Sequence, residues 1–123
     1  MSYMNAVQIE QLLKLDPSVY LHFTDSLGFH SIQQEGLIRT NTKGFVFLTR
    51  MPFSAEQATV NLFISASTHT GRGSHVFVLR LDPGLRIIPT SQNYEGYEYR
   101  ATQSIKLKQN EVLYAGENPF RRR

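Results

Sequence analysis

The apolar residues of this chain change their spacing several times, and each spacing predicts a different element. Near the start they recur at the i, i+3 and i+4 positions of a helix, at Ile9, Leu12 and Leu13. Asn5 is a residue type that caps helices and Pro17 is one that ends them. A helix is therefore predicted over residues 5–15.

Alternation of apolar and polar residues follows from Val19 to Thr24 and predicts a strand. The next segment, Asp25 to Glu35, returns to helical spacing, with Leu27 and Ile32 directed inward and Gly36 placed to close the helix.

Turn-forming residues at 41–44 separate two further strands, Leu37–Thr40 and Phe45–Thr49. Ser54 and Gln57 have the spacing of a capping box. This spacing predicts a helix that begins at Ser54 and runs to about residue 63.

The second half of the chain is predicted to be mostly strand. His75 to Leu81 alternates strongly enough for a central strand, and Asp82-Pro83-Gly84 predicts a turn in which Gly84 takes a positive φ. Extended structure is predicted to resume over Leu85–Ile88. Three short strands are predicted over Tyr97–Thr102, Ser104–Leu107 and Glu111–Ala115.

These elements predict an α+β fold with six or seven mostly antiparallel or mixed strands and three helices. A chain of 123 residues supports one core, so a single domain over residues 1–123 is expected. Within it, residues 1–17 form the N-terminal helix, 18–116 the core and 117–123 a basic tail.

The charge pattern adds little at this level. Three of the 13 basic residues are at the very end of the chain, and without them ten bases face ten acids. The formal charge of +3 therefore indicates a tail rather than a basic face.

The absence of cysteine excludes disulfides, thiolate catalysis and cysteine-ligated metal sites. No apolar run approaches the length of a membrane span, so a soluble protein is expected, cytoplasmic or secreted and delivered into a target cell.

Several common chemistries lack their motif. His69 and His75 do not have the helical spacing that presents two imidazoles to a metal, so no metal site is predicted. Gly71-Arg72-Gly73-Ser74 matches neither a nucleophile elbow nor a phosphate-binding loop. Glu95 and Glu98 remain as candidate acid or base groups, and His22 stands near the end of an early strand, where polar groups can meet a ligand.

The order of these features resembles the ADP-ribosyltransferase superfamily, in its diphtheria-toxin and poly-ADP-ribose-polymerase branch. Leu21-His22-Phe23-Thr24 is similar to the first family motif, and the helix ending in Gly36 is similar to the one that follows it. The strand from Gly44 to Thr49 and the helix beginning at Ser54 resemble the second motif. Glu98, at the start of a late strand, looks like the family glutamate.

The resemblance departs from the family at the second motif, where the usual tyrosine is absent and Phe45 or Phe47 stands nearby. An aromatic wall survives this change, but a tyrosyl hydroxyl contact does not. The chain is also much shorter than a polymerase domain, so it is more similar to the compact toxin-type transferases.

The resemblance implies a split β-sandwich that binds NAD as substrate and needs no metal. Glu98 and His22 would be the catalytic residues, with Glu95 as the alternative to Glu98. His22 would hold the adenosine ribose, Thr24 would support that contact, and the main chain at Phe23 would grip the nicotinamide amide. The remaining cofactor-binding candidates are aromatic walls, a helix-start serine and an arginine for the pyrophosphate: Phe45, Phe47, Phe53, Ser54 and Arg39, with Arg50 as the alternative arginine.

The function implied is mono-ADP-ribosylation of a protein or nucleic-acid target with release of nicotinamide, as in a toxin or effector with an immunity or antitoxin partner. Two alternatives stay open: an NAD glycohydrolase in which water is the acceptor, and a catalytically silent module of the same fold that binds a nucleotide or a partner protein. A purely structural role would need no ligand.

Overall fold

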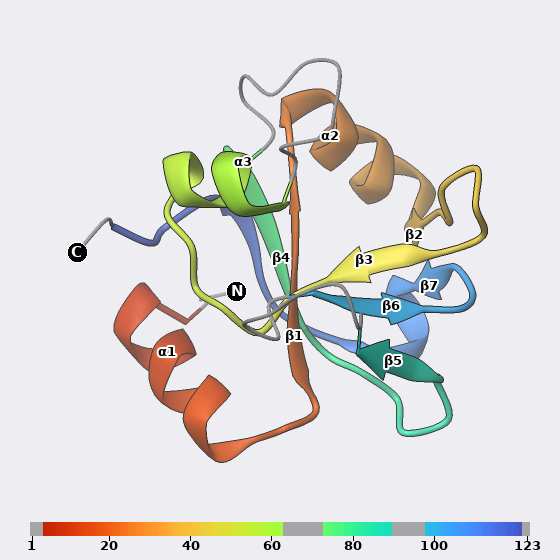
Figure 1. The fold of residues 1–123 in the computed structure, drawn as a ribbon, viewed down its shortest axis with the longest axis horizontal. Coiled ribbons are helices and arrows are strands. Elements are labelled where there is room, and N and C mark those ends of the chain that lie inside the picture. Colours follow the sequence, from red (N-terminus) through yellow and green to blue (C-terminus); the bar gives the residue numbers. More distant parts are fainter. Residues whose placement is uncertain (1–3, 63–72, 90–97, 122–123) are drawn as a thin grey trace.

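The structure is a computed structural model that describes residues 4–62, 73–89 and 98–121, without the side chains of 59–62. These residues form three α-helices, one 3-10 helix and eight strands, which Figure 1 labels. In chain order they are α1 (Ala6–Leu15), β1 (Val19–Thr24), α2 (Ser26–Glu35), β2 (Leu37–Ile38), β3 (Val46–Leu48), α3 (Ala55–Leu62), β4 (His75–Arg80), β5 (Ile87–Pro89), β6 (Tyr99–Ala101), β7 (Ile105–Lys106), η1 (Leu107–Gln109) and β8 (Glu111–Glu117). The predicted α+β class is confirmed, with more strands than the six or seven expected.

The helices begin where their capping residues predict. The Asn5 side chain accepts a hydrogen bond from the Gln8 amide, and the Gln8 side chain accepts one from the Asn5 amide, each at 2.9 Å. Ser54 and Gln57 form the same reciprocal pair at the start of α3. Each pair satisfies amides that the first turn of a helix leaves without a partner.

All the strand pairs among the described residues are antiparallel. Sheet A has the order β1-β4-β8, sheet C has the order β3-β6-β5, and β2 pairs with β7. A single bridge between Leu21 of β1 and Thr49, just after β3, connects sheets A and C. Figure 1 shows the three strands of sheet C extending to one side of β1.

Both faces of sheet A are covered, which explains why β4 reads as almost continuous apolar sequence. Val76, Phe77, Val78 and Leu79 are all fully buried. Figure 1 shows α1 and α3 on one side of β1 and α2 with sheet C on the other. The α1 and α3 side holds Ile9, Leu13, Val19, Leu21, Phe23, Phe53, Ala58, Val76, Val78 and Phe120. The opposite side holds Phe29, Ile32, Ile38, Val46, Leu48, Phe77, Leu79, Leu81, Ala101 and Ile105.

Three sequence expectations about individual positions are wrong. Leu27 is 81% exposed, and Phe29 takes the inward position on α2 instead. Gly84 is not among the described glycines with positive φ. Its turn is closed by the Asp82 carbonyl and side chain, which accept from the Leu85 and Gly84 amides. The tail does not begin at residue 117, because β8 runs to Glu117 and Phe120 is buried in the core.

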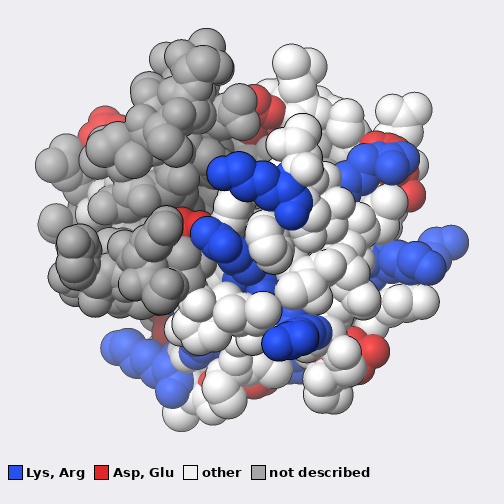
Figure 2. All heavy atoms as spheres, turned by 45° about the vertical axis from the view of Figure 1, so that its right-hand side comes forward, with Lys and Arg blue, Asp and Glu red and all other residues white. Residues whose placement is uncertain are grey.

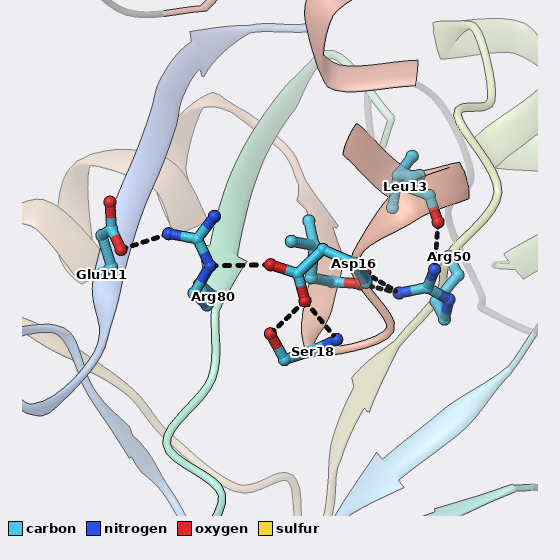
Figure 3. Close-up of polar contacts among 7 residues, drawn as sticks. Leu13, Asp16, Ser18, Arg50, Arg80 and Glu111 are labelled. Atoms are coloured by element: carbon cyan, nitrogen blue, oxygen red, sulfur yellow. Dashed lines mark hydrogen bonds and ion pairs between the residues drawn. The ribbon is translucent and has the colours of Figure 1, made fainter. Parts of the chain in front are cut away.

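A polar network fixes the corner between α1 and β1 (Figure 3). The Ser18 hydroxyl and the Arg80 guanidinium both donate to the Asp16 carboxylate and lower its pKa from 3.8 to about 2. Arg80 also pairs with Glu111, so the same guanidinium links this corner to β4 and β8.

Candidate functional site

The candidate site lies where β1 and β3 separate. The Leu21 amide donates to the Thr49 carbonyl at 2.7 Å, and the Thr49 amide donates back to the Leu21 carbonyl at 2.9 Å. Continuing this antiparallel register would pair Phe23 with Phe47. Instead, the Phe47 carbonyl accepts a hydrogen bond from Nδ1 of His22 at 3.0 Å. The histidine side chain thus replaces a strand pair at the point where the two sheets part.

The split leaves the main chain of Phe23 directed toward the space between the strands. Both backbone groups of Leu21 point toward Thr49 and away from β4. In a strand, backbone groups two residues apart point to the same side. The Phe23 amide and carbonyl therefore point to the same side, and no partner for either group is seen among the described residues. One donor and one acceptor lie next to each other at this edge.

The environment of His22 favours its neutral form. In that form Nδ1 carries the proton, because the Phe47 carbonyl can only accept, and Nε2 carries the lone pair. Burial lowers the pKa of His22, while the hydrogen bond to Phe47 partly opposes that shift. The half-buried imidazole can therefore offer an acceptor at Nε2 at neutral pH.

Thr24 is positioned by the first turn of α2. A Cβ placed on Gly28 would lie 2.1 Å from the Thr24 hydroxyl oxygen, so the hydroxyl occupies the space that a side chain at Gly28 would fill. Asp25 holds this turn by accepting from the Gly28 amide at 2.7 Å. The polar end of β1 is thus fixed against the start of a helix.

Glu98 comes immediately before β6 and is half-buried. Burial raises the pKa of its carboxyl group, and the nearby Arg100 guanidinium opposes that shift. Tyr99, the next residue, pairs with Leu48 of β3. The sheet therefore brings Glu98 to the end of β3 at which Leu21 pairs with Thr49.

Arg100 is a site residue that the sequence analysis missed. Its guanidinium carbon lies 5.0 Å from the centre of the Phe45 ring and 5.5 Å from that of Phe47. Its Nε is buried and has no hydrogen-bond partner among the residues that the structure describes. The available signal was position, because Arg100 is two residues from Glu98 and so projects from the same face of the strand.

The three aromatic residues expected to form walls differ in exposure. Phe47 is 39% exposed and Phe45 is half-buried, so both rings are accessible beside Arg100. Phe53 is only 6% exposed, and its ring centre lies 6.4 Å from that of Phe23 in the core. Phe53 therefore packs in the core rather than beside the rings of Phe45 and Phe47.

The serine and the two arginines that were expected to bind NAD contact other parts of the protein. Ser54 is 6% exposed and caps α3. Arg39 is largely exposed and forms an i,i+4 ion pair with Glu35 on α2. Arg50 donates to the carbonyls of three residues at the end of α1 and the start of β1, namely Leu13, Asp16 and Val19 (Figure 3). Both arginines thus have partners within the protein.

Some candidates lie outside the described residues, including His69 and Glu95. His75 is described, and its Nδ1 lies 2.8 Å from the Ser74 hydroxyl. Among the positions that the structure covers, no three potential metal ligands come together. Over the same positions, every helix is too short or too polar to cross a lipid bilayer.

Comparison with known proteins leaves the site to be judged on its own geometry. No family model, no curated protein and no solved structure matches this chain.

Proposed function

We propose that this chain is an NAD-dependent mono-ADP-ribosyltransferase built on an ADP-ribosyltransferase-like split β-sandwich. The observation that carries the proposal is the separation of β1 from β3, which leaves the Phe23 amide and carbonyl pointing into the split. His22 and Glu98 stand on either side of β3 at this position.

The Phe23 main chain suits the nicotinamide end of NAD. A primary carboxamide carries one carbonyl acceptor and an NH2 donor, and the Phe23 amide and carbonyl supply the complementary pair. Such a ligand would complete the strand edge in the way that an added strand does. Phe47, with its partly exposed ring, would give the nicotinamide an apolar wall beside these hydrogen bonds.

His22 suits a ribose hydroxyl. Its Nδ1 is held by the Phe47 carbonyl, which fixes the orientation of the ring. The lone pair on Nε2 can accept a hydrogen bond from a hydroxyl group, and the lowered pKa keeps that lone pair available at neutral pH.

Glu98 suits the reacting centre. When the bond between ribose C1′ and nicotinamide breaks, its electron pair leaves with the nicotinamide nitrogen and positive charge develops on the sugar. A fixed carboxylate at that point stabilises the transition state more than the ground state. The acceptor then forms a new bond to C1′ and loses a proton. Arg100 favours the ionised carboxylate that this role requires.

The test is release of nicotinamide from NAD by the wild-type chain and by Glu98→Gln. We expect the substitution to lower turnover by about 100-fold or more, because the carboxylate charge is lost while the side-chain shape is kept. Glu35→Gln is the matched control and should retain wild-type turnover, since Glu35 pairs with Arg39 on α2. His22→Phe should also lose most of its turnover.

The same assay has outcomes that contradict the proposal. Absence of both NAD binding and turnover in the wild-type chain would exclude an enzyme acting on NAD. Turnover that persists in Glu98→Gln would move the catalytic role to Glu95. Nicotinamide release without ADP-ribose on any macromolecule would instead assign NAD glycohydrolase activity.

A further inference from the structure

The outer face of sheet C carries an aromatic and cationic surface. Tyr99 and Ala101 of β6 pack inward against the core. Because side chains alternate along a strand, Arg100 projects from the opposite face. Its register partners are Phe47 on β3 and Ile88 on β5, so these three side chains form one row across that outer face.

The same alternation of side chains extends this row along each strand. Leu85 and Ile87 pack inward, so Arg86 between them projects outward and is exposed. Phe45 is two residues from Phe47 and contacts Arg100 from the same side. We name this surface the sheet C platform and define it as Phe45, Phe47, Arg86, Ile88 and Arg100.

No described helix packs on this platform, as the exposure of Phe47 and Arg86 shows. Glu98, two residues before Arg100, marks the end of the platform that adjoins the split between β1 and β3. The platform therefore leads directly to the proposed reacting centre.

Further cations lie on segments that adjoin sheet C in the chain, because β7 follows β6 and Lys43 precedes β3. Lys43 is exposed in the turn before β3, and Lys106 and Lys108 are exposed on β7 and η1. Within the described ranges no ion pair is formed by these lysines, Arg86 or Arg100. Figure 2 turns forward the right-hand side of Figure 1, where sheet C lies, and shows lysine and arginine side chains over that face, with acidic side chains mostly near its edges. The balanced charge of residues 1–120 thus conceals a local excess of cations.

We propose that the sheet C platform binds single-stranded nucleic acid and presents it to the split as the ADP-ribose acceptor. This inference rests on the proposed function. Exposed aromatic rings on an uncovered sheet stack unpaired bases, and the cations around them bind phosphates. Arg100 combines both features, because its half-buried guanidinium lies over two rings and carries the positive charge that attracts phosphates.

Transfer to the nucleic acid balances without any further reactant. A nitrogen or oxygen nucleophile of the bound strand forms the bond to ribose C1′ and gives up a proton, and nicotinamide leaves with the electron pair of the broken bond. NAD supplies the ADP-ribose, so no oxidant or reductant is needed.

The binding test uses short labelled oligonucleotides of single-stranded DNA and RNA and measures fluorescence anisotropy over a range of salt concentrations. Arg86→Glu should weaken binding about tenfold and reduce the slope of affinity against salt, because a phosphate contact is lost. Lys14→Glu makes the same charge change on α1, away from sheet C in Figure 1, and should leave affinity within about twofold of wild type. Equal weakening in both variants, or no binding of either oligonucleotide at low salt, would overturn the proposal.

The transfer test adds NAD labelled in its adenylate part to the oligonucleotide and measures label on the strand. Label on the strand, reduced in Arg86→Glu but not in Lys14→Glu, supports the platform as the acceptor site. Nicotinamide release with label on protein and none on either strand would overturn this inference and leave the proposed function intact. Salt-dependent binding without any nicotinamide release would contradict the proposed function and remove the acceptor role, while binding at the platform would stand.

Discussion

At the scale of single residues, His22 and Arg100 matter most because each connects parts of the molecule that the chain order keeps apart. His22 donates to the Phe47 carbonyl and so holds the place of a missing strand pair. Arg100 lies over the rings of Phe45 and Phe47 and opposes the rise that burial causes in the pKa of Glu98. Their roles follow from position and charge together.

Arg100 should set the pH at which Glu98 becomes active. Removing its positive charge raises the pKa of the Glu98 carboxyl further, and the account requires the ionised form. In Arg100→Gln, the acidic limb of the pH profile for nicotinamide release should therefore move to higher pH. Arg86→Gln, farther along the same face, should leave the limb in place. An unmoved limb in Arg100→Gln would show that the two side chains do not interact.

The sequence predicts His22, Glu98 and the accessible rings of Phe45 and Phe47 as candidates because residue type and strand position limit the choices. It does not predict the partners of Phe53, Arg39 and Arg50, since composition cannot show which neighbours a side chain meets after folding. Arg50 reaches carbonyls of α1 and β1, and Phe53 packs on Phe23, through contacts between segments distant in the chain.

At the scale of elements, local signals locate most helices and strands while tertiary packing sets their inward faces. The caps at Asn5 and Ser54 fix the starts of α1 and α3. On α2, Leu27 and Ile32 are five residues apart and therefore about 140° apart around the helix. Phe29 and Ile32 are only about 60° apart, so these two share the buried face.

Arg50 should stabilise the joint between α1 and β1 rather than bind a phosphate. Arg50→Met removes the donors to the carbonyls of Leu13, Asp16 and Val19 while keeping the apolar stem. We expect the free energy of unfolding to fall by about 1–3 kcal/mol, because partly buried carbonyls lose their partners. Arg39→Met removes only an exposed i,i+4 pair and should change it by less than about 0.5 kcal/mol. Denaturant unfolding measures both.

A phosphate-binding role for Arg50 would give a different result. In that case Arg50→Met would raise the KM for NAD with little change in stability. Equal stability losses in Arg50→Met and Arg39→Met would contradict the structural role.

At the scale of the whole molecule, two antiparallel sheets meet at the Leu21 and Thr49 bridge and then part. The sequence predicts the strands and the α+β class, but it cannot predict which strands pair or where a pair ends. The split, the sheet C platform and the local excess of cations all depend on that pairing. The candidate residues therefore form a site only once the strands have paired in the folded molecule.

The central claim is that the split between β1 and β3 holds the nicotinamide end of NAD at the Phe23 main chain. The most direct measurement is a titration of the isotopically labelled chain with NAD, followed through the backbone amide resonance of Phe23. NAD should produce a saturable shift of this resonance, and nicotinamide alone should reproduce it. NAD should also change the resonances of the His22 ring. Binding of NAD that leaves the Phe23 amide and the His22 ring unchanged would contradict the account.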